Sequence, residues 1–273
     1  MSKTIAIIGF GEAGSVFAAA AGWEADACAY DVAPERASVM HDIGVACGAD
    51  LRDTLASASL VLSLVTADAA ADVARAAAPL LTDGALYCDM NSIAPQTKRE
   101  AAAAVDATGG RYVDVAVMAP VEPGRLNVPL LLSGEAAADA ATALSRAGFA
   151  DIRIVGTEVG RASAIKMLRS VMVKGIEALT AEMMLAATRA GVVDDVLASL
   201  DASEKDWGWS KRAAYNLERM ATHGLRRAAE MEESAKTLAA LGVDPAMTSA
   251  TVRRQREMAG AAPICDAQRS EPA

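Results

Sequence analysis

The first half of the chain alternates short apolar runs with longer stretches in which apolar residues recur every three or four positions. The first pattern is typical of buried strands, and the second of amphipathic helices. The strands are predicted at Thr4–Gly9, Ala25–Tyr30, Leu60–Val65, Ala85–Cys88, Tyr112–Val117, Pro129–Ser133 and Ile152–Val155. The helices between them are predicted at Ala67–Ala78, Ala94–Ala107 and Glu135–Ala147. This alternation indicates βαβ units and a parallel sheet that is buried on both faces.

The pattern changes beyond Val155, where almost no run has the period of a strand. Helices are predicted at Ala162–Ala190, Val193–Ser199, Ser210–Ala239 and Pro245–Met258. We therefore predict an α/β chain in which a Rossmann-type, doubly wound parallel sheet precedes an all-α C-terminal domain. The predicted parts are an α/β domain (1–158), a helical domain (159–262) and a flexible tail (263–273).

Composition and charge narrow the possible functions. Apolar residues make up 53% of the 273 residues and aromatic residues only 4%, which favours closely packed helices over a β-sandwich. A formal net charge of −9 disfavours a nucleic-acid partner, because phosphate backbones repel an acidic chain. We see no run of 18 apolar residues, no signal peptide and no Cys or His spacing typical of a metal site, so we expect a cytoplasmic protein without metal or membrane contact.

The strongest motif is Gly9-Phe10-Gly11-Glu12-Ala13-Gly14, which follows the first predicted strand and opens a helix. In a G-x-G-x-x-G turn the first glycine permits the tight turn, the second lets the backbone approach a pyrophosphate, and the third lets helix and strand pack closely. The helix N-terminus then offers free N–H groups to the phosphates. This context predicts a dinucleotide-binding site.

Asp31 ends the second predicted strand at the spacing of a carboxylate that accepts hydrogen bonds from the adenosine ribose. Because a carboxylate there repels a 2′-phosphate, we expect NAD in preference to NADP. Arg36 is a cation that can swing towards such a phosphate, but we interpret it as a solvated residue at a helix start. Val65 and Thr66, at the end of the third predicted strand, and Asn91 are further cofactor-binding candidates.

Three more segments complete a wider pattern. They are Asp89-Met90-Asn91-Ser92-Ile93-Ala94-Pro95, Asp114-Val115-Ala116-Val117-Met118-Ala119-Pro120 and Gly160-Arg161-Ala162-Ser163-Ala164-Ile165-Lys166-Met167-Leu168-Arg169-Ser170. With the glycine motif, their order and spacing resemble a divergent branch of the β-hydroxyacid dehydrogenases and 6-phosphogluconate dehydrogenases. The resemblance covers nearly the whole chain and implies a nicotinamide-dependent oxidoreductase.

The resemblance also implies roles for single residues. Lys166 matches the lysine that acts as acid and base in that family, and Ser170 stands four residues on, where the family usually has asparagine. Asn91 and Ser92 occupy the segment that helps to hold the substrate. Met118 begins the segment Met118-Ala119-Pro120, where the family has a Ser-Gly-Gly turn that donates N–H groups to a substrate carboxylate.

Pro120 has no N–H to donate, so the sequence departs from the family at this turn. His223 and Arg227 lie four positions apart on a predicted helix and are candidates to bind an anionic or polar substrate group instead. The alternative is a helical histidine beside solvated arginines.

We thus predict an NAD-dependent dehydrogenase acting on a CH–OH group of a small polar substrate such as a hydroxy acid. An NAD(P)H-dependent imine reductase and a dinucleotide sensor without turnover are the alternatives. Met167, Met172, Met183 and Met184 are spread around the axis of one helix, which predicts a homodimer through the C-terminal helices. A monomer whose later helices cover these residues is the alternative.

Overall fold

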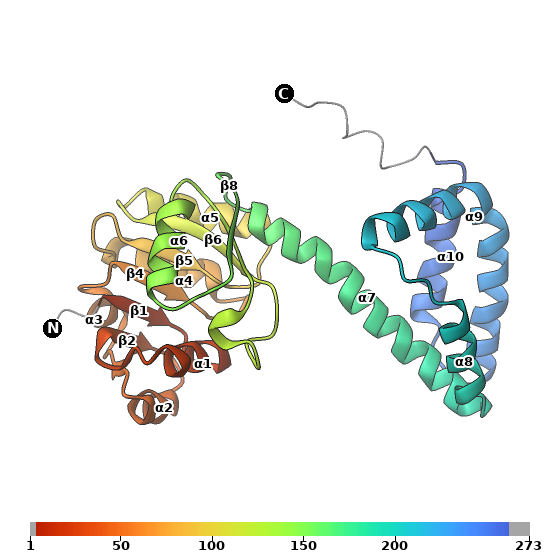
Figure 1. Ribbon diagram of the computed structural model, residues 1–273, viewed down its shortest axis with the longest axis horizontal. Coiled ribbons are helices and arrows are strands. Elements are labelled where there is room, and N and C mark those ends of the chain that lie inside the picture. The colour runs from red at the N-terminus through yellow and green to blue at the C-terminus, as the bar shows by residue number, and fades with distance from the viewer. Residues whose placement is uncertain (1–3, 262–273) are drawn as a thin grey trace. The chain divides into compact units, whose positions relative to one another are not determined.

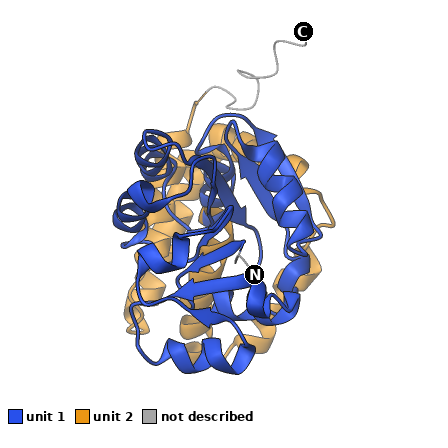
Figure 2. Cartoon of the chain, turned by 90° about the vertical axis from the view of Figure 1, so that its left-hand side faces the viewer, with its two compact units in different colours: residues 1–170 blue, residues 171–273 orange. Residues whose placement is uncertain are grey.

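The protein is described by a computed structural model that covers residues 4–261. The chain divides into two compact units, Met1–Ser170 and Val171–Ala273 (Figure 2). The division falls within the long helix α7 (Arg161–Ala190), a little beyond the boundary predicted at residue 158. The tail predicted at 263–273 lies outside the described residues.

The first unit is built on one eight-stranded sheet in the order β3-β2-β1-β4-β5-β6-β7-β8 (Figure 1). Its strands are β1 (Ile5–Ile8), β2 (Ala27–Tyr30), β3 (Ala46–Cys47), β4 (Leu60–Ser63), β5 (Leu86–Asp89), β6 (Arg111–Val117), β7 (Leu130–Ser133) and β8 (Ile152–Gly156). All seven predicted strands are present, and β3 is additional. The order reverses beside β1, so β1 and β4 form the switch point at which such sheets bind ligands.

One strand corrects the prediction of a parallel sheet. β7 pairs antiparallel with β6, whereas the other neighbouring pairs are parallel. A parallel pair needs a long crossover, usually a helix. The segment between β6 and β7 holds only the short 3₁₀ turn η3 (Arg125–Asn127), so the chain returns antiparallel beside the strand it has just left.

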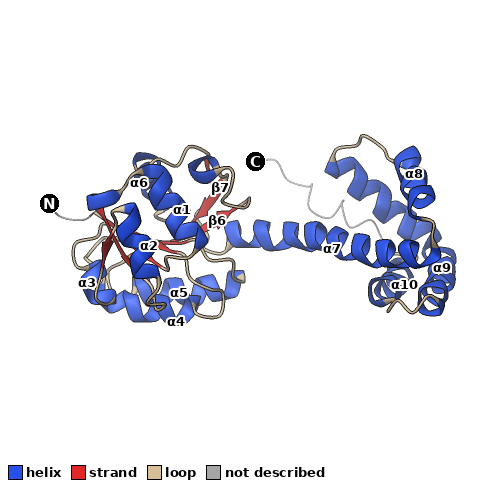
Figure 3. Ribbon diagram, turned by 90° about the horizontal axis from the view of Figure 1, so that it is seen from below, coloured by secondary structure: helices blue, strands red, loops and turns tan. Residues whose placement is uncertain are grey.

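Helices cover both faces of the sheet (Figure 3). One core contains Ile5 and Ile7 and packs against α1 (Glu12–Ala21), α2 (Arg36–Ile43) and α6 (Ala137–Arg146). The other contains Ala6 and Ile8 and packs against α3 (Leu51–Leu55), α4 (Ala70–Ala77) and α5 (Pro95–Asp106). Successive residues of a strand point to opposite faces, so both sets must be apolar. Short 3₁₀ turns lie at η1 (Glu24–Asp26) and η2 (Ala78–Leu80).

The second unit is helical throughout its described part. After the C-terminal part of α7 come α8 (Val193–Ser203), α9 (Trp209–Ala240) and α10 (Ala246–Met258). α9 and α10 pack closely at Gly224, where a Cβ atom would lie only 2.3 Å from the carbonyl oxygen of Gln255. The predicted class, a Rossmann-type domain followed by an all-α region, is confirmed. Among residues 4–261, no helix combines the length and the apolar character that crossing a membrane requires.

Candidate functional site

The glycine turn lies between β1 and α1, at the carboxyl edge of the sheet. Gly9 has a φ of 90°, and a Cβ atom on it would lie 2.4 Å from the carbonyl oxygen of Leu64. A Cβ on Gly14 would lie 2.6 Å from the carbonyl oxygen of Gly9. A Cβ on Gly11, by contrast, would have no heavy atom of the described chain within 4 Å. Gly9 and Gly14 are thus required by packing, whereas Gly11 leaves open space at the start of α1 for a close-approaching ligand.

Asp31 follows β2 directly and is tied to the glycine turn. Its Oδ2 accepts a hydrogen bond from the backbone N–H of Phe10 at 2.6 Å, and its Oδ1 accepts one from the N–H of Ala33 at 2.9 Å. A carboxylate has about four acceptor positions, so each oxygen keeps one for a hydroxyl group. The carboxylate therefore suits a ribose diol beside the turn. Glu12 and Ala13 open α1 on the other side of Gly11.

Val65 and Thr66 follow β4, which pairs directly with β1. Val65 is half-buried, and Thr66 is exposed. Val65 Cγ1 would lie 3.0 Å from a Cβ at Gly9, so it borders the glycine turn. The structure thus brings both residues to the edge at which Gly11 and Asp31 lie.

Lys166 and Ser92 form a direct contact across 74 positions of sequence. Lys166 Nζ donates a hydrogen bond to Ser92 Oγ at 2.6 Å. Ser92 is exposed just beyond β5, and Lys166 is half-buried near the start of α7. An amine and a hydroxyl in contact at the carboxyl edge can pass a proton to and from a bound substrate. Ser170 lies one helical turn after Lys166 and is half-buried.

Asn91 is buried next to this pair. Its Nδ2 donates to Asp89 Oδ1 at 2.8 Å and to Ser63 Oγ at 3.0 Å. Its Oδ1 is buried and has no hydrogen-bond partner among the described residues. A buried acceptor without a partner is costly, so a bound donor such as a hydroxyl or an amide would satisfy it.

The structure adds three buried charges that sequence reasoning did not select. Asp89, Lys98 and Asp114 have side chains with no exposed surface, on β5, α5 and β6. The available signal was an aspartate inside an otherwise apolar strand run, Tyr112–Val117, since buried charges need partners. Lys98 carries no such signal, because polar residues surround it in sequence.

The segment Met118-Ala119-Pro120 offers few donors. The N–H of Met118 donates to the carbonyl oxygen of Pro129 at 2.9 Å, which continues the β6–β7 pairing. Pro120 has none to donate. A substrate carboxylate therefore finds at most the N–H of Ala119 here, as the sequence departure predicted.

The remaining candidates, His223 and Arg227, lie on α9 in the second unit. His223 is exposed and Arg227 is half-buried, with a buried Nε atom that has no partner among the described residues. Their role in substrate binding stays a prediction.

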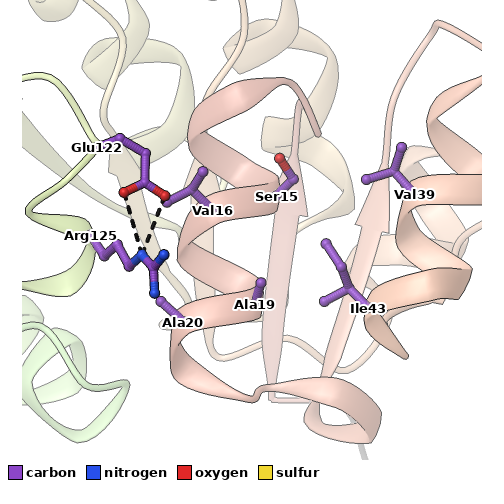
Figure 4. Close-up of a pocket in the computed structure, with 8 residues that line it drawn as sticks. All are labelled: Ser15, Val16, Ala19, Ala20, Val39, Ile43, Glu122 and Arg125. Atoms are coloured by element: carbon purple, nitrogen blue, oxygen red, sulfur yellow. Dashed lines mark hydrogen bonds and ion pairs between the residues drawn. The ribbon is translucent and has the colours of Figure 1, made fainter.

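A hollow of about 340 Å³ lies on the flank of α1 (Figure 4). Its lining is mainly small and apolar, and an ion pair between Arg125 Nε and Glu122 Oε1 at 3.3 Å borders it. The other lining residues are Ser15, Val16, Ala19, Ala20, Val39 and Ile43.

Two families match the chain in separate places. The NAD binding domain of 6-phosphogluconate dehydrogenase matches residues 4–148, and a domain of unknown function (DUF1932) matches residues 187–258. The first match covers strands β1 to β7 of the sheet with the glycine turn and Ser92, and the second lies in the helical unit.

Solved structures share this architecture. A conserved hypothetical protein from Sinorhizobium meliloti 1021 is 38% identical, with a TM-score of 0.63 over 94% of this chain and 88% of that one. A conserved protein of unknown function, described as similar in structure to 3-hydroxyacid dehydrogenases, is 31% identical, with a TM-score of 0.62 over 93% and 96%. A Myxococcus stipitatus imine reductase variant in complex with NAD+ is 19% identical, with a TM-score of 0.76 over 94% of each chain.

Proposed function

The chain belongs to the family that carries the NAD binding domain of 6-phosphogluconate dehydrogenase, and from this membership we propose an NAD-dependent oxidoreductase. We propose that it moves a hydride between the nicotinamide and the hydroxyl or carbonyl carbon of a small polar substrate such as a hydroxy acid. The observation that carries this proposal is the 2.6 Å contact between Lys166 Nζ and Ser92 Oγ at the carboxyl edge.

The residues at this edge fit a dinucleotide. Gly11 leaves room for phosphates at the N-terminus of α1, and Asp31 keeps acceptor positions for the ribose. Val65, Thr66 and Asn91 would border the cofactor beyond the turn. When bound, the nicotinamide supplies the hydride chemistry, and the protein supplies position and charge.

Lys166 would move the proton. In the oxidation direction, neutral Lys166 takes the proton of the substrate hydroxyl, with Ser92 in contact to orient the amine. In the reduction direction, the ammonium form returns this proton to the developing alkoxide. Ser170, one turn further along α7, would add a hydrogen-bond donor to the substrate.

A panel of substrates tests the proposal directly. The full chain is incubated with NAD and hydroxy acids or sugar acids, and formation of the reduced cofactor is followed by its absorbance. Turnover that disappears in Lys166→Ala supports the proposal. Tight binding of the cofactor without turnover of any compound, in either direction, would instead support a dinucleotide sensor.

Imine reduction is the second candidate, because the substrate segment is poor in donors. The N–H of Met118 already donates to the carbonyl oxygen of Pro129, and Pro120 has no N–H. This segment therefore offers a substrate carboxylate fewer hydrogen-bond donors than a Ser-Gly-Gly turn does. Imine reductases share the fold of the chain. Faster reduction of cyclic imines than of keto acids would favour this reaction.

We also propose a homodimer, joined through the C-terminal helices. The middle of α7, from Val171 to Ala181, is exposed at every position except the half-buried Gly175. It nevertheless carries Val171, Met172, Ile176 and Leu179. A helix face that carries several large apolar residues is usually buried, and a second copy of the chain would bury this one.

A further inference from the structure

Lys98 is a lysine with no exposed surface, held between two buried carboxylates of the first unit. Its Nζ lies 2.5 Å from the carbonyl oxygen of Asp89, 2.9 Å from Asp89 Oδ1 and 3.4 Å from Asp114 Oδ1. Asp89 and Asp114 are paired in register on β5 and β6. The ammonium therefore joins the end of β5 to the middle of β6.

The Asp89 side of this cluster fixes the turn that carries Ser92. Asp89 Oδ1 accepts hydrogen bonds from Asn91 N at 2.9 Å and Asn91 Nδ2 at 2.8 Å, while Asp89 Oδ2 accepts one from the Tyr112 hydroxyl at 2.6 Å. Asn91 is thus held through both backbone and side chain. Ser92 is the next residue, so its position follows from that of Asp89.

The Asp114 side fixes the start of α7. Asp114 Oδ2 accepts hydrogen bonds from Gly160 N at 3.1 Å and Ser163 N at 3.0 Å. Ser163 Oγ donates to Asp114 Oδ1, and Ser133 Oγ donates to Asp114 Oδ2 at 3.1 Å. A carboxylate on the first N–H groups of a helix satisfies them and suits the positive end of its dipole. Lys166 stands one turn further along the same helix.

Among residues 4–261, Lys98 is the one group with a hydrogen bond or ion pair to both carboxylates. Two acidic side chains face each other across adjacent strands, and without the ammonium they would repel one another in a site with little water. Burial, and then the charge of Asp89, raise the pKa of the Tyr112 hydroxyl that donates to Asp89, as expected where little water reaches the carboxylates. Apolar side chains of similar volume could fill the same space, so packing alone does not explain why these buried positions are charged.

We propose that Lys98 is a positioning residue that holds the Ser92 turn and the first turn of α7 in register, and thereby sets the contact between Ser92 Oγ and Lys166 Nζ. Lys98 does not reach the reacting atoms. It acts through Asp89 on Ser92 and through Asp114 on Lys166. The catalytic part of this inference rests on the proposed function, while the positional part does not.

Amide exchange tests the positional part without any substrate. Lys98→Met keeps an unbranched side chain that is one atom shorter and removes its charge. We expect exchange at Gly160–Ser163 to become at least about 10-fold faster, because Asp114 loses its partner, while the glycine turn is unchanged. Glu100→Met, on the exposed side of the same helix, is the matched control. Unchanged exchange at Gly160–Ser163 would overturn the proposal.

A double-mutant cycle tests the catalytic part. With a substrate from the panel, Lys98→Met should lower kcat by about 10–100-fold, the effect of a misplaced acid–base group, with little change in the Kd of NADH. In the Lys166→Ala background the same change should lower residual turnover less than about 2-fold. If Lys98→Met lowered turnover by the same factor with and without Lys166, Lys98 would act on stability alone, and the proposal would be overturned.

Ser163→Ala extends the test if Lys98→Met does not fold. It removes one hydroxyl from Asp114 and leaves the ammonium in place, so the fold should be retained. Amide exchange near Gly160 should again become faster and kcat should again fall, both by less than in Lys98→Met. An unchanged exchange rate and kcat would contradict the positioning role. Failure of every substrate in the panel would refute the proposed function, and the exchange result would then decide the positional role by itself.

Discussion

Lys166 and Ser92 meet although they lie 74 positions apart, and the acid–base hypothesis depends on this pair. Lys166→Ala should lower turnover by about 10²–10⁴-fold, the range for a lost acid–base group. Cofactor binding should hardly change, because the glycine turn and Asp31 supply the main contacts proposed for the cofactor. Steady-state kinetics with the best substrate, together with titration of NADH, measures both quantities.

Lys174 provides the matched control for this prediction. It is exposed two turns further along α7 and outside the Lys166–Ser92 contact. Lys174→Ala should keep its turnover within about 2-fold, the range of surface substitutions away from a site. If Lys166→Ala kept most of its turnover as well, another group would have to move the proton.

Asp31 is the residue that we expect to select the cofactor. We expect NADH to bind more tightly than NADPH, because the carboxylate repels a 2′-phosphate. Asp31→Ala should narrow the ratio of the two dissociation constants by about 10-fold, near the effect of one charge. Both constants should also rise, since the N–H of Phe10 loses its acceptor.

The ratio, rather than either constant, is therefore the quantity to compare by fluorescence titration. Asp42→Ala is the control, because Asp42 is an exposed carboxylate on the neighbouring helix α2. Equal or tighter binding of NADPH by the unaltered chain would contradict the assignment of Asp31.

Residues in local motifs were predictable, and residues that act through sheet register were not. The glycine turn and Asp31 follow from spacing along the chain, and the structure places them together. Lys98 sits among polar residues of a helix, so its sequence context is that of a solvated side chain. Its burial comes from the register of Asp89 with Asp114, which no local pattern encodes.

At the scale of elements, the periodicity of apolar residues and the length of a helix or strand decide whether it can be predicted. The long helices α7, α9 and α10 were predicted within one or two residues, since many turns share one pattern. α3 and β3 were missed, because five and two residues are too few to establish a period, and of α2 only the start at Arg36 was predicted. The direction of β7 was missed too, because apolar runs carry no information on strand direction.

One element-scale prediction concerns the junction of α7 with α10 inside the second unit. Glu182 Oε2 accepts a hydrogen bond from Met247 N at 2.7 Å, and Glu182 Oε1 accepts one from Thr248 N at 2.8 Å. Burial acts to raise the pKa of Glu182, but the hydrogen bonds from Thr248 and Met247 outweigh it and lower the pKa below its usual value. The ionised form is therefore the one that stabilises α10.

This pKa shift gives the sign of the pH dependence. A depressed folded-state pKa adds stability above the unfolded-state pKa of about 4.3, and this stability is lost as the pH falls through the folded-state value. Glu182→Gln should cost about 1–2 kcal/mol at neutral pH, as a lost helix cap does. The difference from the unaltered chain should vanish in acid.

Amide exchange of the peptide around Met247 and Thr248, followed from pH 7 into acid, measures this difference locally. The control is Glu177→Gln, which changes an exposed carboxylate on the same helix. A loss of protection that stays constant down to acid pH would show that the charge of Glu182 does not stabilise α10.

At the scale of the whole molecule, α7 exposes several large apolar side chains along its middle, and a contiguous apolar patch of this kind is typical of an interaction surface. Met172, Ile176 and Leu179 recur at the spacing of one helix face, and their exposed fractions are 47%, 46% and 43%. Within the described residues of the second unit, this face stays exposed. A two-fold pairing of the same face from two copies would remove it from water.

Light scattering at micromolar concentration should therefore give twice the chain mass of 28.0 kDa. Replacing Met172 and Ile176 together by glutamate should shift the mass to that of one chain, because four charges would meet in a two-fold interface. Val32→Glu, on the first unit and 85% exposed, should leave the mass unchanged. A single-chain mass for the unaltered protein that does not rise with concentration would refute the dimer, and each active site would then be built from one chain alone.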